Sequence, residues 1–282
     1  MTPDGVSLDL IELDGKATPS AIVGEILRQN PNMPLPVPLE AIAALGGIKD
    51  IQELTTEGFE GMLLTNPEKS EGVIAVKAHG NPQRRRFTLG HELGHYFLPW
   101  HRQTRFSCTA DSIKETASDS KAARGVEMEA EANAFASEIL MPTSIFKKKL
   151  RAFGDPDIAQ VVRLSEAFDT SIEATARRYL NLSDYPVAFV FSHHSNIRYW
   201  SKGREFPYVL SVRNGQPLPK ESLARLTGES VTEMEELDSD IWLDANRGKR
   251  LPEKIYEQTL HQQDGYKVSL LLLNDIPDDE DD

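Results

Sequence analysis

Two histidines four residues apart, His91 and His95, constrain this chain more than any other feature of its sequence. At about 100° per residue, an α-helix brings them onto one face, one turn apart, so both imidazoles can reach a single metal ion. Glu92 lies beside His91 and is placed to hold a water molecule rather than to ligate the ion. We expect a helix from about Arg84 to Leu98, ended by Pro99. This pattern is typical of a zinc site at which a carboxylate moves a proton.

The residues around the two histidines indicate a packed helix rather than a chance match on a solvated one. Leu89, Leu93 and Tyr96 form an apolar stripe along the same segment. Gly90 and Gly94 interrupt it, although a glycine inside a helix costs roughly 1 kcal/mol relative to alanine. We therefore expect these glycines to make room for the close approach of a neighbouring element or of a substrate strand.

Two histidines leave a third ligand to be found, and we expect it on a helix over Val126–Leu140. The glutamates of that helix are Glu127, Glu129, Glu131 and Glu138. Its apolar stripe is formed by Met128, Ala132, Phe135, Ala136, Ile139 and Leu140. Glu129 lies roughly 60° from the centre of this stripe and Glu131 roughly 100°. We therefore predict that Glu129 binds the ion, with Asn133 as its hydrogen-bonding partner, and that Glu131 lies on the outer flank.

Two blocks of the sequence resemble the ImmA/IrrE family of metallopeptidases. Residues 86–96 read Arg-Phe-Thr-Leu-Gly-His-Glu-Leu-Gly-His-Tyr. Residues 129–136 read Glu-Ala-Glu-Ala-Asn-Ala-Phe-Ala, and residues 139–142 read Ile-Leu-Met-Pro. The resemblance covers roughly residues 36–182, and the paired blocks are far more specific than the first motif alone.

The resemblance implies a thermolysin-like minimal peptidase core with Zn²⁺ as its cofactor. The family's metal ligands fall on His91, His95 and Glu129, and its general base falls on Glu92. The resemblance also implies a zinc-dependent metalloendopeptidase whose protein substrate is an XRE-like helix-turn-helix repressor. Limited cleavage of such a repressor would switch on genes for a stress response or a mobile element.

The order of predicted elements favours an α+β chain in two parts. We expect a peptidase domain over residues 1–184, with its core at about 36–150 and a helical extension over 151–184. Short strands are predicted before the motif helix, at residues 48–54, 61–64 and 72–76. Helices are predicted after the second block, at residues 145–153, 158–168 and 172–180.

Residues 185–282 are expected to form an antiparallel α+β module of unknown role. Its predicted strands lie at residues 187–191, 197–200, 208–212, 241–243, 255–260 and 266–273. An acidic tail, Asp278–Asp282, is expected to end the chain.

Composition limits the cellular compartment and the kinds of binding partner that we expect. The 282 residues carry a formal net charge of −13, which disfavours binding of a nucleic-acid backbone through Lys and Arg. A single cysteine excludes an intramolecular disulfide framework. The first residues contain no apolar stretch of the signal-peptide type, and the most apolar run, Val268–Leu273, is too short to span a bilayer. We therefore expect a cytoplasmic protein that binds neither membrane nor, directly, nucleic acid.

A second interpretation is a noncatalytic, antitoxin-like or DNA-binding regulator with a structural zinc site. Residues 158–180 would then form a helix-turn-helix, with Arg177 and Arg178 in the recognition helix. Because the chain is acidic, we prefer a plain helical pair for this segment. The carboxylate of Glu92 and the count of three ligands, where a structural zinc site normally has four, also favour catalysis.

The remaining histidines are expected on the surface rather than at the metal. His101 lies in a polar segment, and His193 and His194 lie at the end of a predicted strand. The sequence does not decide which residue would stabilise an oxyanion; the candidates are His101, Tyr96, Arg177 and Tyr179.

Overall fold

The computed structural model describes residues 5–78, 81–108, 120–227, 230–244 and 250–274, and the predicted acidic tail lies outside them. The fold is mixed α+β, as predicted. Its contacts divide the chain into two compact units, residues 1–143 with 167–171 and residues 144–166 with 172–282. In the described ranges, no helix combines the length and the apolar character needed to cross a bilayer.

The first unit contains a four-stranded sheet with the order β1-β3-β2-β4. Its strands are β1 (Ile48–Leu54), β2 (Gly61–Thr65), β3 (Gly72–Lys77) and β4 (Arg105–Cys108). β1 pairs in parallel with β3, whereas β2 pairs antiparallel with both β3 and β4. The helices are α1 (Pro19–Gln29), α2 (Leu39–Gly46), α3 (Pro82–Phe97) and α4 (Ser120–Leu140), and a short 3₁₀ turn covers Ile11–Leu13.

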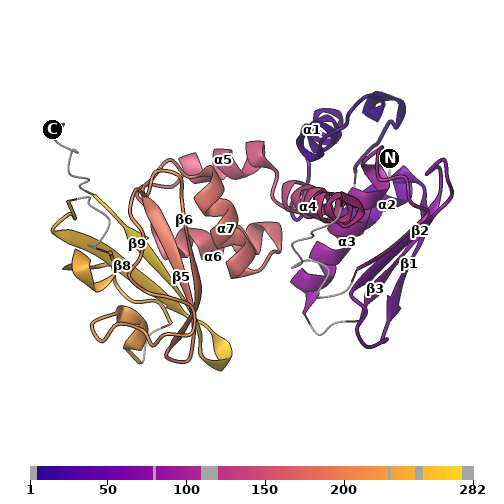
Figure 1. Ribbon diagram of the computed structural model, residues 1–282. Helices are drawn as coiled ribbons and strands as arrows, with labels where there is room; N and C mark the ends of the chain where they lie inside the picture. The colour runs from indigo at the N-terminus through magenta and orange to yellow at the C-terminus, as the bar shows by residue number, and fades with distance from the viewer. Residues whose placement is uncertain (1–4, 79–80, 109–119, 228–229, 245–249, 275–282) are drawn as a thin grey trace. The chain divides into compact units, whose positions relative to one another are not determined.

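Helix α3 lies between the sheet and α4, as Figure 1 shows. The apolar stripe predicted for α3 is buried, with Leu89 and Leu93 fully buried. The stripe predicted for α4 is buried along its whole length, from Met128 to Leu140. Burial of each leucine, isoleucine, phenylalanine or methionine in these stripes contributes about 1.5–3 kcal/mol, so the two stripes together fix the rotation of both helices. The faces that carry the candidate ligands are set by this packing.

Strand β4 was not predicted from the sequence, in which its residues follow His101 in a polar segment. Its residues pair with β2 through their backbones, and the side chain of Phe106 is buried. Because the strand has only four residues, the alternation of Phe106 and Cys108 with two polar residues is too short to predict it from the sequence.

The second unit contains a five-stranded antiparallel sheet with the order β6-β5-β9-β8-β7. Its strands are β5 (Val187–His193), β6 (Asn196–Lys202), β7 (Glu235–Asp238), β8 (Lys254–His261) and β9 (Tyr266–Leu272). Its helices are α5 (Thr143–Arg151), α6 (Ile158–Phe168) and α7 (Ile172–Leu182), and 3₁₀ turns cover Leu223–Arg225, Ser239–Ile241 and Gln263–Gly265. The predicted strands at 208–212 and 241–243 reduce to one isolated bridge between Leu210 and Leu243.

Strand β5 is buried on both faces and explains why the units divide where they do. Ala188 and Val190 pack into a cluster around Trp242. On the other face, the ring of Phe189 meets the ring of Tyr179 in α7, with 5.9 Å between the ring centroids. In addition, the backbone N–H of Ile158 in α6 donates to Gln258 of β8 at 2.7 Å. Most of the helical segment that the sequence suggested as an extension of the first part therefore packs on the second sheet.

The α6–α7 pair also bears on the helix-turn-helix interpretation. The guanidinium of Arg177 donates to the Tyr199 hydroxyl at 2.8 Å and to Glu173 at 3.0 Å. It also lies 4.8 Å above the Tyr199 ring, within the range of a cation–π contact. This arginine thus binds its own sheet and helix, as expected for a plain helical pair.

Candidate metal centre

Helix α3 is fixed at both ends, which sets the position of the motif that it carries. At its start, the side chain of Asn81 accepts from the backbone N–H of Arg84, and Pro82 occupies the first turn. At its end, the ammonium of Lys69 donates to the carbonyls of His95 and Leu98 at 2.6 and 2.8 Å. A cation there satisfies two carbonyls that the helix leaves open and complements the negative end of the helix dipole.

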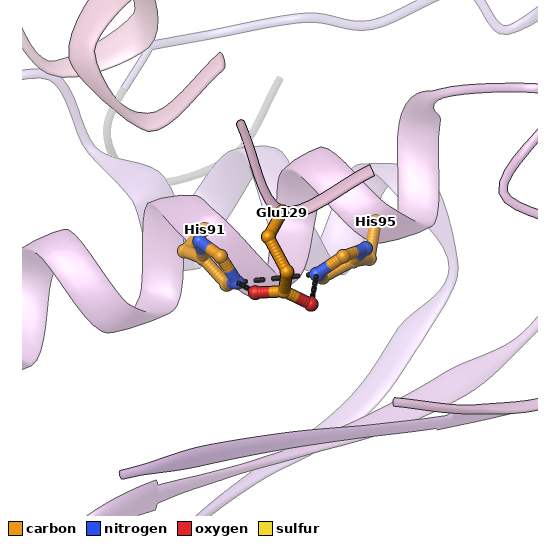
Figure 2. Close-up of side chains that lie close together, drawn as sticks. All are labelled: His91, His95 and Glu129. Atoms are coloured by element: carbon orange, nitrogen blue, oxygen red, sulfur yellow. Dashed lines mark hydrogen bonds and ion pairs between the residues drawn. The ribbon is translucent and has the colours of Figure 1, made fainter. Parts of the chain in front are cut away.

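Three predicted ligands, His91, His95 and Glu129, converge at one point, with one ligand atom of each within 4.8 Å of the others. The Nε2 atoms of the two histidines lie 3.1 Å apart. Glu129 Oε2 lies 3.2 Å from His91 Nε2, and Glu129 Oε1 lies 3.3 Å from His95 Nε2. Figure 2 shows the three side chains pointing toward one another. Two imidazole nitrogens and a carboxylate form a donor set that suits a divalent cation such as zinc.

The glycines of α3 make this convergence possible because α4 crosses directly over them. A Cβ atom at Gly90 would lie 3.4 Å from the Cα of Ala136, and one at Gly94 would lie 3.0 Å from the Cα of Ala132. Gly94 therefore faces the backbone of α4 so closely that a larger residue would require α4 to shift by a few tenths of an ångström. Of the two roles considered for these glycines, the structure supports the close approach of a neighbouring helix.

Asn133 corrects one expectation about the support of the ligands. Helical spacing suggested Glu129 as its partner, whereas the amide oxygen of Asn133 lies 2.9 Å from Nδ1 of His91. An amide oxygen accepts, so His91 donates through Nδ1 and keeps the lone pair of Nε2 for an ion. Residues one turn apart on α4 share a face, so spacing alone did not decide which α3 neighbour Asn133 would contact.

His101 and Glu131 correct a second expectation. His101 was predicted on the surface, but its side chain is fully buried, with Nδ1 3.0 Å from Nδ1 of His95. Its Nε2 lies 3.2 Å from Glu131 Oε2, so Glu131 contacts a buried ring instead of pointing only to solvent. The tight turn after α3 explains the burial, because the N–H of His101 donates to the Leu98 carbonyl and directs the chain back under the helix.

The charges of the cluster follow from burial and from the contacts just described. Burial would raise the pKa of the Glu129 carboxyl, but hydrogen bonds to the two histidines hold it well below its usual range. Burial lowers the pKa of His95, and it lowers the pKa of His101 to about 3. For His91, burial opposes protonation, but the hydrogen bond to Glu129, the charges of Glu92 and Glu129 and the contact with Asn133 together outweigh it and raise the pKa. These shifts favour an anionic Glu129 and a neutral His95, the protonation states in which these groups bind metals, whereas the contacts of His91 favour its protonated form until a metal replaces the proton.

Glu92 projects from the same helix toward the sheet and is fully buried. A Cβ atom at Gly61 of β2 would clash with the Glu92 carboxylate and with Thr88. The strand therefore passes the carboxylate so closely that a larger residue at position 61 would displace the side chains of Glu92 and Thr88. No pattern in the sequence indicated this role for Gly61.

Of the four candidates for oxyanion stabilisation, Tyr96 already uses its hydroxyl in a hydrogen bond to the backbone. The hydroxyl of Tyr96 donates to the Gly46 carbonyl at 2.9 Å, and its side chain is buried. Tyr179 and Arg177 belong to the second unit, where the hydroxyl of Tyr179 donates to Gln160 at 2.9 Å. His193 and His194 lie in that unit as well, at the turn between β5 and β6.

Comparison with known proteins bears on the identity of the first unit. A family model described as the IrrE N-terminal-like domain, Peptidase M78, matches residues 49–180. The match supports the ImmA/IrrE resemblance of the two sequence blocks. It covers less than half of the chain, but it includes all of α3 and α4 and therefore the whole candidate metal centre.

The chain was also compared with solved structures and with curated proteins. A solved structure described as a Mycobacterium tuberculosis transcriptional regulator is similar to the chain, with a TM-score of 0.47 and 15% sequence identity. The similarity covers 83% of this chain and 69% of that one. Among curated proteins, none matches the sequence.

Proposed function

We propose that this chain is a zinc-dependent metalloendopeptidase. The observation that carries the proposal is the convergence of His91, His95 and Glu129 beside a buried Glu92, within a domain of a peptidase family. A cluster built only for stability would have no use for the carboxylate of Glu92. A structural zinc site is also normally closed by four protein ligands, whereas the cluster found in the described ranges has three.

His91 and His95 would hold the ion through Nε2, and Glu129 through its carboxylate. When bound, zinc supplies Lewis-acid chemistry that activates water and polarises the scissile carbonyl. Glu92 acts as the general base: its carboxylate takes a proton from the attacking water and delivers it to the leaving amine. The sheet beside Glu92 limits the volume around the carboxylate, and Gly61 leaves the room that it occupies.

The substrate that we propose is a helix-turn-helix repressor, cut at one or very few bonds. This choice rests on the resemblance of the two motif blocks to the ImmA/IrrE family. The cut repressor would release its operator and derepress stress or mobile-element genes. We assign no role to the second unit.

A cleavage assay on the full chain tests the proposal. The purified protein should contain one zinc per chain by elemental analysis and should cut a helix-turn-helix repressor encoded next to its own gene. A chelator should stop the cleavage, and added zinc should restore it. Casein and unfolded proteins are the controls, and their degradation at rates comparable to the repressor would contradict the proposed substrate class. A protein that binds no metal would contradict the activity itself.

A further inference from the structure

We propose that His101 and Glu131 form a hydrogen-bond relay that fixes the orientation and the tautomer of His95 for metal binding. The inference rests on the proposed function, because it takes His95 as a ligand through Nε2. It assigns positioning roles to two residues that lie outside the ligand set. The first sits in the turn after α3, and the second lies on α4 two residues beyond Glu129.

The relay is a continuous series of short contacts. Glu131 Oε2 lies 3.2 Å from His101 Nε2, and His101 Nδ1 lies 3.0 Å from His95 Nδ1. From there, the opposite nitrogen of the His95 ring faces Glu129 and His91 at 3.3 and 3.1 Å. The three residues therefore connect the partly exposed carboxylate of Glu131 to the candidate ion position through two fully buried rings.

The direction of donation along this series decides whether His95 can bind a cation. A neutral imidazole has one nitrogen that donates and one that accepts. A carboxylate accepts, so Glu131 favours a proton on Nε2 of His101, which leaves Nδ1 of that ring as an acceptor. The acceptor then favours a proton on Nδ1 of His95, which leaves the lone pair of Nε2 facing the ion. Without Glu131, a proton on Nδ1 of His101 would favour the His95 tautomer that presents N–H to the metal.

The two ligand histidines are thus supported in different ways. His91 donates to Asn133, whose amide oxygen can only accept, so one partner is sufficient. His95 faces a histidine, which accepts or donates according to its tautomer, so a third group is needed to set the direction. Aromatic contacts hold the two rings of the relay in place. Phe106 stacks on His95 with 4.3 Å between the ring centroids, and Trp100 meets His101 edge-on with 4.4 Å between the centroids.

The first test compares two glutamates of the same helix in the full chain. Zinc affinity is measured by competition with a chromogenic chelator for the unaltered protein, Glu131→Ala, Glu129→Ala and the control Glu127→Ala, in which an exposed glutamate is removed. Loss of a partner that supports a metal ligand typically weakens affinity about 10- to 100-fold, which is the loss expected for Glu131→Ala. Glu127→Ala should match the unaltered protein. Equal affinities for Glu131→Ala and Glu127→Ala would overturn the relay.

The second test separates the relay from a general structural effect. An asparagine at 101 places an amide oxygen near the position of Nδ1, and this oxygen accepts without help from Glu131. His101→Asn should therefore keep most of the zinc affinity, whereas His101→Leu should lose it. In the His101→Asn background, Glu131→Ala should cause no further loss. If that loss is as large as in the unaltered background, Glu131 acts by another route and the relay is wrong.

These assays also distinguish failure of the inference from failure of the proposed function. If the unaltered chain binds no zinc, or if Glu129→Ala binds it as tightly, the metal centre itself is wrong and the relay falls with it. If both behave as proposed while Glu131→Ala is silent, the relay alone is wrong. Circular dichroism of each metal-free variant checks that the helices are retained.

Discussion

The contact between α3 and α4 can be tested by adding one methyl group at each of its two glycines. At Gly94, the new Cβ would lie 3.0 Å from the Cα of Ala132, 3.1 Å from its carbonyl oxygen and 3.1 Å from the Cβ of Phe135. Optimal carbon–carbon contacts are about 3.5–4.0 Å, so the helices would have to separate. At Gly90, the nearest atoms belong to Ala136 and lie at 3.4 Å, close to ordinary contact.

The magnitude follows from two opposing effects. Alanine favours a helix over glycine by about 1 kcal/mol, and this gain is common to both substitutions. Overpacking of a tight interface costs about 1–3 kcal/mol, and we expect it only for Gly94→Ala. The difference in the free energy of unfolding between the two variants should therefore be about 1–3 kcal/mol, with Gly90→Ala the more stable.

Urea unfolding of the metal-free variants, followed by circular dichroism, measures this difference without a contribution from bound metal. Zinc affinity provides an independent reading, because the ligands come from both helices. Gly94→Ala should bind zinc more weakly than Gly90→Ala. Equal stability and equal affinity for the two variants would refute the argument that Gly94 sets the spacing of the ligand helices.

Three further substitutions, one of them with a matched control, test other parts of the structure. Glu129→Ala should lower zinc affinity by orders of magnitude and abolish cleavage. The control Glu127→Ala should change the free energy of unfolding by no more than about 0.5 kcal/mol. Elemental analysis and thermal melts with and without chelator measure both effects. Gly61→Ala should displace the Glu92 carboxylate, so cleavage should fall while one zinc per chain remains, and an unchanged rate would count against this placement of Glu92. Lys69→Met should destabilise the chain by about 1–3 kcal/mol in urea unfolding, because the carbonyls of His95 and Leu98 lose a charged donor; an unaltered unfolding curve would contradict that role.

Helical periodicity accounts for what could be predicted at the site. In α3 and α4 the apolar residues repeat with the spacing of a helix, so burial of the stripe fixes where every other side chain on the helix points. The phase of the α4 stripe distinguished Glu129 from Glu131, and the structure brings Glu129 to the two histidines. The cost of glycine inside a helix indicated that Gly90 and Gly94 make room for a neighbour, although not which one.

Contacts that depend on the course of the chain could not be predicted in this way. His101 reaches His95 because a turn follows Pro99, and Glu131 reaches His101 across 30 residues of sequence. No periodic pattern links such residues. The proline that ends α3 so soon before His101 was a usable signal, since a chain that turns there returns toward the end of the helix. The role of Gly61 likewise depends on which strand passes Glu92. The order of short strands in a sheet cannot be predicted from their apolar alternation alone.

The most direct test of the central claim separates metal binding from chemistry at Glu92. Glu92→Gln keeps the size of the side chain but removes the base, and the residue is not one of the three converging ligands. We predict that this variant binds one zinc per chain, as the unaltered protein does, and no longer cleaves the repressor. Elemental analysis and a cleavage assay on the same preparation provide both readings. A Glu92→Gln protein that still cleaves at the original rate would contradict the account.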